Sequence, residues 1–127
     1  MRYAFTIYRD EAALETATPE QAQAMSRAYA EVTQEMQDKG VFVAGDGLHP
    51  SQTATTVRVR DGERSVVDGP FAETKEALGG FYVLDCKDLD EAIEWAAKIP
   101  GSQVGSVEIR PVLVFDEAGN LVQEATA

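Results

Sequence analysis

The spacing of apolar residues along the chain changes between two periods, and this change predicts the order of its elements. Residues 2–8 are aromatic and β-branched and are followed by a charged run, which is typical of a strand. Residues 18–40 have apolar side chains at three- and four-residue steps, which indicates one face of a helix. That face consists of Ala22, Met25, Tyr29, Val32 and Met36.

Local end signals support two helices. Thr18 and Gln21 have the spacing of a capping box at the start of the first helix, and Gly40 is suited to its end. Residues 87–101 contain a similar start, because Asp88 precedes Glu91 by three residues. The predicted apolar face of this second helix consists of Leu89, Ala92, Ile93 and Ala96.

The remaining apolar segments predict five further strands. Asp61-Gly62 is a tight-turn signal between two of them and indicates a hairpin. The strands are expected within residues 41–48, 53–60, 63–68, 79–86 and 105–115. The order is strand, helix, several strands, helix, strand, which is the split βαβ pattern of an α+β, ferredoxin-like fold with an inserted hairpin.

The predicted strands are apolar on both faces, although two helices can cover only one face of an antiparallel sheet. The two sides are Tyr3, Phe5 and Ile7 against Ala4, Thr6 and Tyr8 in the first strand, and Tyr82 and Leu84 against Phe81 and Val83 in a later one. Strands that are apolar on both sides require cover on both sides. We therefore expect a second copy of the sheet to cover the open face, giving a homodimer.

Residues 65–85 connect two apolar segments through a stretch that is unfavourable for a strand. Pro70 has no N–H to donate and Gly69 weakens a strand, so the fourth strand should end before them. One interpretation is a structural corner between strands. The other is a ligand site, in which Asp68 and Glu73 project into a cleft that Phe71 closes.

Composition restricts the classes of function. The chain has 127 residues, a hydrophobic fraction of 44% and a net charge of -11, which fits one folded domain and disfavours nucleic acids and anionic membranes as partners. The single cysteine and single histidine exclude the usual zinc sites, and we expect no metal and no cofactor. The first residues do not resemble a signal peptide and no segment is apolar enough to span a bilayer, so a cytoplasmic protein is expected.

Several motifs then indicate a family. The segments "GDGLHPSQTATTVRVRDG", "VVDGPFAETKEALGGFYVLD" and "DLDEAIEWAAKIPGSQVGSVEIRPV" closely resemble the DGPF group of the YCII-related domain family. The resemblance implies a domain over residues 1–112, with a tail of uncertain order at residues 113–127. It also implies that two ferredoxin-like protomers pair as a dimeric α/β barrel.

The resemblance suggests two kinds of function. Some relatives in the wider superfamily are enzymes, including a dehydrochlorinase that acts on a chlorinated aromatic, with a carboxylate after the first strand and a histidine on the first helix as the active pair. Asp10 stands at the carboxylate position, but the first predicted helix contains no histidine. DGPF members also resemble proteins encoded beside alternative sigma factors, which suggests a regulatory or accessory role.

Three residues outside the corner are candidates for chemistry. His49, in a loop, is the only side chain with an unperturbed pKa near neutrality, so it is the natural acid–base group; the alternative is a surface or capping histidine. Asp10 serves as a base only if burial raises its pKa. Arg110 either binds an anion inside the barrel or pairs with an acid such as Glu108. Cys86 is expected to be a buried, inert thiol.

These observations favour a small-molecule-binding or accessory protein of the DGPF group, with Asp68, Phe71, Glu73 and Arg110 as candidate ligand-binding residues. The alternative is a small enzyme that performs acid–base or elimination chemistry on a small substrate, which includes aromatic molecules, with His49 and Asp10. A purely structural interaction module is the third interpretation. Convergence of His49 and an acid on one pocket would distinguish the first two.

Overall fold

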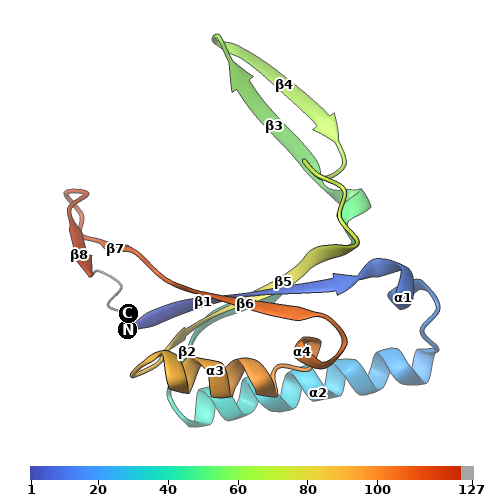
Figure 1. The fold of residues 1–127 in the computed structure, drawn as a ribbon, viewed down its shortest axis with the longest axis vertical. Coiled ribbons are helices and arrows are strands. Elements are labelled where there is room, and N and C mark those ends of the chain that lie inside the picture. The colour runs from blue at the N-terminus through green and yellow to red at the C-terminus, as the bar shows by residue number, and fades with distance from the viewer. Residues whose placement is uncertain (124–127) are drawn as a thin grey trace.

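A four-stranded antiparallel sheet forms the centre of the chain, and the computed structural model describes residues 1–123 (Figure 1). The strands lie in the order β2–β5–β1–β6, so that each strand pair joined by a helix is separated by a strand of the other pair. This is the split arrangement predicted from the element order. The strands are β1 (Arg2–Asp10), β2 (Phe42–Gly47), β5 (Glu76–Asp85) and β6 (Ser106–Pro111).

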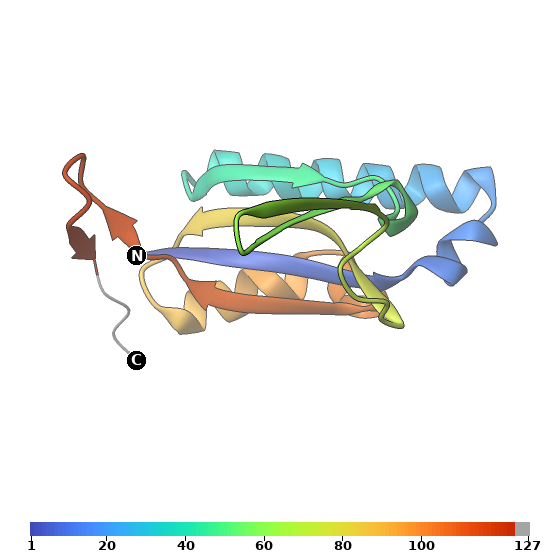
Figure 2. The same ribbon diagram turned by 90° about the horizontal axis from the view of Figure 1, so that it is seen from above.

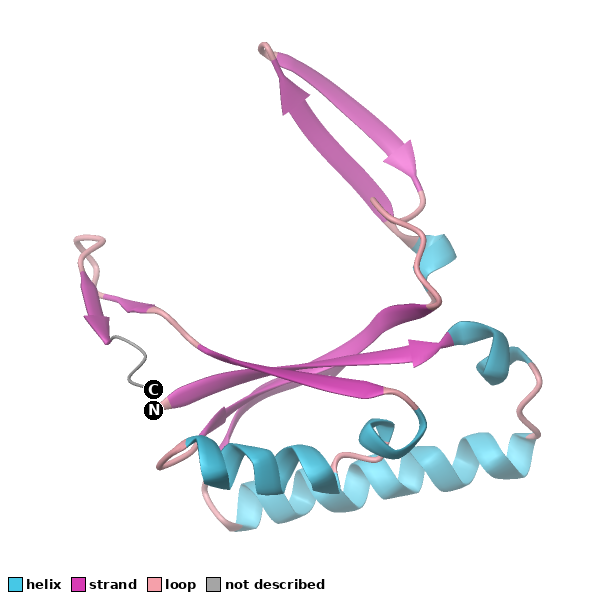
Figure 3. Cartoon of the chain, in the orientation of Figure 1, coloured by secondary structure: helices cyan, strands magenta, loops and turns pink. Residues whose placement is uncertain are grey.

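Both predicted helices form, and their starts have the predicted caps. In α2 (Pro19–Asp38), the Thr18 hydroxyl accepts the backbone N–H of Gln21, while the Gln21 side chain accepts that of Thr18. In α3 (Leu89–Lys98), Asp88 accepts the N–H of Glu91 at 2.9 Å. The two helices lie on the same side of the sheet, as the cyan ribbons in Figure 3 show.

The core fills the space between these helices and one face of the sheet. That face carries Tyr3, Phe5, Ile7, Tyr82 and Leu84, and the cluster continues through Val32, Met36, Val41, Cys86, Ala92, Trp95, Ala96 and Ile99. The predicted face of α3 is partly wrong. Leu89 and Ile93 are 50% and 51% exposed, whereas Trp95 is buried, because the helix turns the larger aromatic side chain toward the sheet.

None of the helices in the described part of the chain covers the opposite face of the sheet (Figures 1 and 2). Its side chains include Ala4, Thr6, Tyr8, Phe81 and Val83, all of which are only partly buried. The alternation of buried and half-exposed positions along β1 and β5 confirms the two-sided pattern read from the sequence.

A hairpin formed by β3 (Thr55–Arg60) and β4 (Glu63–Asp68) projects from the end of the sheet, on the side away from the helices (Figure 1). Its turn has positive φ at both Asp61 (53°) and Gly62 (78°), as the Asp-Gly signal predicts. At its base, the Gly69 N–H donates to the Ala54 carbonyl at 2.7 Å. Gly69 itself has φ 104°, so the chain does turn a corner there.

The last predicted strand is interrupted. We expected one strand over residues 105–115, but β6 ends at Pro111 and the chain resumes as β7 (Val114–Phe115), paired with β8 (Leu121–Gln123). Proline has no N–H for the ladder, which favours an end there. The part of the predicted tail at residues 124–127 lies outside the described residues.

Three short helices were not predicted: α1 (Glu11–Glu15), η1 (Ser51–Thr53) and α4 (Gly101–Val104).

The described residues contain neither a membrane-spanning helix nor a cluster of metal-binding side chains. None of their helices is long and apolar enough to cross a membrane. Within residues 1–123, no group of three or more His, Cys, Asp or Glu side chains is placed to hold a metal ion.

Candidate functional site

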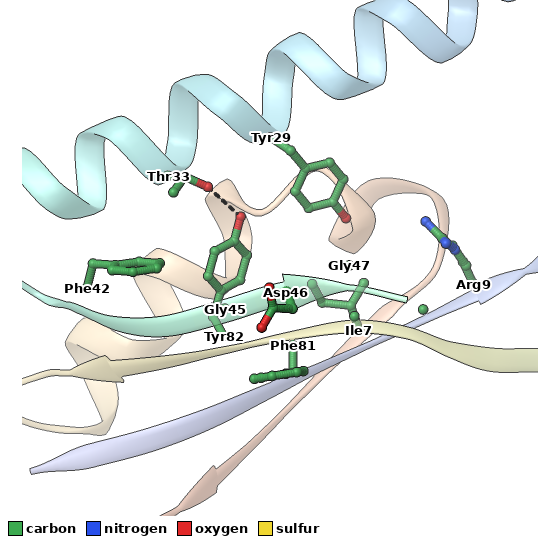
Figure 4. A pocket seen from close by; sticks show the side chains of 12 residues that line it. Ile7, Arg9, Tyr29, Thr33, Phe42, Gly45, Asp46, Gly47, Phe81 and Tyr82 are labelled. Atoms are coloured by element: carbon green, nitrogen blue, oxygen red, sulfur yellow. Dashed lines mark hydrogen bonds between the residues drawn. The ribbon is translucent and has the colours of Figure 1, made fainter. Parts of the chain in front are cut away.

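A cavity of about 340 Å³ lies between α2 and the edge of the sheet formed by β2, β5 and β1. Figure 4 shows Arg9, Tyr29, Thr33 and Tyr82 pointing into this space, whereas Phe81 points away from α2. The lining residues are Ile7, Arg9, Tyr29, Thr33, Phe42, Gly45, Asp46, Gly47, Gly79, Gly80, Phe81 and Tyr82.

Two glycines make room for the largest side chains of the cavity. A Cβ on Gly45 would lie 2.6 Å from Cδ1 of Tyr82, so the tyrosine ring occupies that space. A Cβ on Gly79 would collide with the guanidinium of Arg9. Neither glycine has a positive φ, so both are required for space and not for backbone conformation.

A β-bulge sets the position of Arg9. Ile7 pairs with Gly80 and the next residue, Tyr8, pairs with Leu78, so the register between β1 and β5 passes over Gly79. Bulges of this kind re-aim side chains and are common beside functional sites. Here the bulge leaves Gly79 beneath the Arg9 side chain, at the end of the cavity.

The guanidinium of Arg9 has unused hydrogen-bonding capacity. Its Nη2 donates to the Leu48 carbonyl at 3.4 Å, but its Nε is buried and has no hydrogen-bond partner among the described residues. None of the ion pairs found among residues 1–123 includes Arg9. An unpaired buried donor is unfavourable in free energy. A ligand that supplies an acceptor for this donor would therefore bind favourably.

Hydroxyl groups complete the polar part of the cavity. Thr33 Oγ1 and Tyr82 Oη share a hydrogen bond of 2.7 Å between α2 and β5. Burial raises the pKa of the Tyr29 phenol, and a backbone hydrogen bond from Gly101 and, to a smaller extent, the positive charge of Arg9 offset part of this rise. Tyr29 is therefore a neutral hydroxyl at neutral pH.

These groups can bind and orient a small molecule. Ile7 and Phe42 supply apolar walls, while Arg9 and the three hydroxyls supply directed polar contacts. The lining residues include no histidine and no cysteine. Arg9 and the three hydroxyls are groups that can form hydrogen bonds to a small molecule.

Comparison with known proteins places this chain in a family. The model of the YCII-related domain matches residues 1–116. The chain belongs to the YCII-related domain family. An uncharacterized protein of Rhizobium meliloti (strain 1021) is 37% identical over 117 residues, which is 91% of this chain and 94% of that relative.

A solved structure also resembles this YCII-related chain weakly. It is the 5-chloro-2-hydroxyhydroquinone dehydrochlorinase of Burkholderia phenoliruptrix AC1100, in complex with 2,5-dihydroxybenzoquinone. The TM-score is 0.48 and the identity is 11%, with 94% of this chain and 100% of that chain covered. A likeness of this size carries no conclusion about the chemistry of this YCII-related protein.

The predicted acid–base pair of the YCII-related chain lies outside the cavity lining. Asp10 caps α1 by accepting the Ala12 N–H at 3.0 Å, and His49 is exposed in the loop after β2. The adjacent carboxylate, Glu11, reaches this loop and accepts the Ser51 N–H at 2.8 Å. Ser51 hydrogen bonds, from its side chain and its backbone, lower the pKa of Glu11. The catalytic roles of His49 and Asp10 stay predictions.

The four predicted ligand-binding residues are spread over the surface. Asp68 and Glu73 are exposed on either side of the corner, and Phe71 is 79% exposed. Arg110 is exposed on β6 and its Nε donates to Glu108 at 3.0 Å, which is the alternative considered for it. None of the four lines the cavity, and their part in binding stays a prediction.

Sequence reasoning missed Arg9, Tyr29, Thr33 and Tyr82 as site residues. Tyr29 and Tyr82 were read as core positions, and Arg9 only as part of the charged end of a strand. The available signal was Gly79-Gly80, a glycine pair inside a strand, which indicates close approach of a neighbouring group. That group is the Arg9 guanidinium at Gly79 and the β2 backbone at Gly80.

Cys86 has no part in this site. Its side chain is 1% exposed, and burial raises the pKa of the thiol to about 11. A thiol that stays protonated at neutral pH is a poor nucleophile. The prediction that Cys86 is buried is confirmed, and its raised pKa agrees with the expectation of an inert thiol.

Proposed function

We propose that this YCII-related protein binds a small organic molecule in the cavity between α2 and the sheet. The observation that carries the proposal is the convergence of Arg9, Tyr29 and the Thr33–Tyr82 pair on one space of about 340 Å³. This volume lies within the range of small-molecule sites, and few, directed polar groups among apolar walls are characteristic of them.

The proposal also assigns the chain to the DGPF group, on the Asp68-Gly69-Pro70-Phe71 motif. The motif forms the base of the β3–β4 hairpin and lies outside the cavity lining. In this proposal the motif has a structural part, and the protein works as an accessory or regulatory binding protein whose ligand occupies the cavity.

The proposed assembly is a homodimer that pairs through the open sheet face. Tyr8, Phe81 and Val83 are partly exposed on that face, although they lie in the central strands β1 and β5. The β3–β4 hairpin supports the same conclusion, because Val57, Val59 and Val66 are each more than half exposed. An isolated two-stranded hairpin is marginally stable in water, so a second copy is the natural cover for both.

A fragment screen tests the binding function. Neutral and charged fragments are added to the ¹⁵N-labelled wild-type protein, and backbone chemical shifts are followed by NMR. Binders are expected to shift residues of β2, β5 and the middle of α2. Thr33→Phe, which fills part of the cavity, should abolish these shifts, whereas Gln37→Phe, at an exposed position of the same helix, should preserve them. A wild type that binds no fragment in the cavity contradicts the proposal.

A further inference from the structure

We infer that the ligand of this cavity carries a carboxylate, which binds the Nε edge of Arg9, on an otherwise largely apolar body. This inference rests on the proposed function and specifies the chemical class of the ligand. Arg9 is the only cationic side chain among the lining residues. The Arg9 guanidinium, whose buried Nε has no partner among the described residues, is therefore the strongest charged binding group among the lining residues.

The position of the guanidinium is set before a ligand arrives. Gly79 provides the space in which the guanidinium lies, and the Leu48 carbonyl accepts one Nη2 hydrogen. The Nε–H has no acceptor among the described residues, and the Leu48 carbonyl takes only one of the two hydrogens on Nη2. A carboxylate has the planar, two-oxygen geometry that matches this edge of a guanidinium.

Within residues 1–123, no acidic side chain is found paired with this edge. Asp46 is the only carboxylate among the lining residues, and it is exposed. Its neighbour Gly45 faces Tyr82 on the helix side of β2, whereas Asp46 pairs with Phe81, whose side chain points away from α2 (Figure 4). Side chains alternate along a strand, so the Asp46 carboxylate lies on the far side of the sheet edge from Arg9.

The surroundings favour a single negative charge over a phosphate dianion. One guanidinium supplies one positive charge, and the chain as a whole carries a net charge of -11. A dianion would therefore remain partly uncompensated in a cavity that also has apolar walls. A carboxylate needs only the one cation that is present.

The other lining residues indicate the shape and polarity of the rest of the ligand. Figure 4 shows Arg9 at one end of the view and Phe42 at the other, with Tyr29 and the Thr33–Tyr82 pair between them. A carboxylate at Arg9 would place the body of the molecule against Ile7 and toward Phe42. The hydroxyl groups between them can meet one further polar substituent.

Titration with matched probes tests the inference. Benzoate and benzamide have nearly the same size and shape and differ in charge, so they isolate the contribution of the carboxylate. We expect benzoate to bind the wild type at least about tenfold more tightly than benzamide, as measured by NMR titration. Arg9→Gln should remove this preference, and Arg27→Gln, at an exposed arginine outside this cavity, should keep it.

A second readout avoids dependence on the folding of Arg9→Gln. The ¹⁵Nε–¹H resonance of Arg9 in the wild type should shift on addition of benzoate and stay in place with benzamide. Equal affinity for the two probes, an unmoved Arg9 resonance, or tighter binding of inorganic phosphate would each overturn the carboxylate assignment. If only neutral fragments bind in the cavity, the proposed function stands without it; if no fragment binds there, both fail.

Discussion

The guanidinium of Arg9 lies in the space that a Cβ on Gly79 would fill. The Cζ and Cδ atoms of Arg9 would be 2.8 and 3.0 Å from such a Cβ. The two residues belong to neighbouring strands, β1 and β5, and meet at the bulge between Ile7 and Tyr8. Because residue 79 is a glycine, the guanidinium of Arg9, the only cationic group among the lining residues, can occupy this space.

Gly79→Ala should displace Arg9 and weaken binding of benzoate by about tenfold or more. Because the displaced group is the end of a flexible side chain, the free energy of unfolding should change by less than about 1 kcal/mol. Chemical denaturation and benzoate titration measure the two effects.

The adjacent residue provides the control for this prediction. A Cβ on Gly80 would lie 3.0 Å from the Asp46 backbone carbonyl, which cannot rotate away. Gly80→Ala should therefore cost about 1–3 kcal/mol of stability through overpacking and leave Arg9 in place. Unchanged benzoate affinity in Gly79→Ala would show that the guanidinium does not need this space.

The dimer proposal predicts opposite outcomes for two charges on opposite faces of the sheet. Val83 is half-exposed on the open face, so Val83→Glu should give a folded monomer. Ile7 is 4% exposed beneath the helices, so Ile7→Glu should unfold the chain, because an unpaired charge in the core is very unfavourable. Light scattering and circular dichroism distinguish the two results, and a monomeric wild type at micromolar concentration would refute the dimer.

Gly69→Val should loosen the base of the β3–β4 hairpin. Gly69 has φ 104°, and it closes the base through its N–H to Ala54 and its carbonyl to the Thr56 hydroxyl at 2.8 Å. A β-branched residue in that conformation costs about 1–3 kcal/mol. Hydrogen exchange of the hairpin amides should therefore accelerate. Pro70→Ala, next to it, should have a much smaller effect, and equal exchange in both variants would contradict a strained corner.

Glu11 should make stability depend on pH. Hydrogen bonds from Ser51 hold the pKa of Glu11 below its usual range, so the folded protein binds that proton less readily than the unfolded chain. The stabilisation is therefore present above the unfolded pKa of ~4.3 and is lost as pH falls through the folded pKa. Glu11→Gln should be less stable than wild type at pH 7. The difference should vanish in strong acid, as followed by urea denaturation; a difference that does not depend on pH would contradict this account.

Much of the local structure could be predicted from the sequence. The capping box of Thr18 and Gln21, the cap at Asp88 and the turn at Asp61-Gly62 all formed as expected. These features depend on hydrogen bonds and backbone conformations within a few residues, so the neighbouring sequence contains the information that they need. The two-sided pattern of β1 could also be predicted, because successive side chains of a strand point to opposite faces of the sheet.

The candidate site was much less predictable. The sequence pointed to His49, Asp10 and the corner around Phe71, which are distributed over loops and strand ends. His49 was suggested by its residue type, Asp10 by its position in the family resemblance, and the corner by a motif that is unfavourable for a strand. Whether such groups share a cavity depends on how distant elements pack, and periodicity does not report this.

The sequence by itself determined the two long helices, the strands of the central sheet, the β3–β4 hairpin and their order, and it indicated a sheet that is apolar on both faces. Only the tertiary structure decided which groups converge. Arg9 looks like the charged end of a strand, and it becomes the buried cation of a cavity because a bulge 70 residues later leaves Gly79 beneath it. Likewise, α3 packs on the sheet with Trp95 buried, whereas the sequence pattern predicted that Leu89 and Ile93 would be buried. Register and helix rotation are settled by packing between segments far apart in the chain, which is why local patterns could not give them.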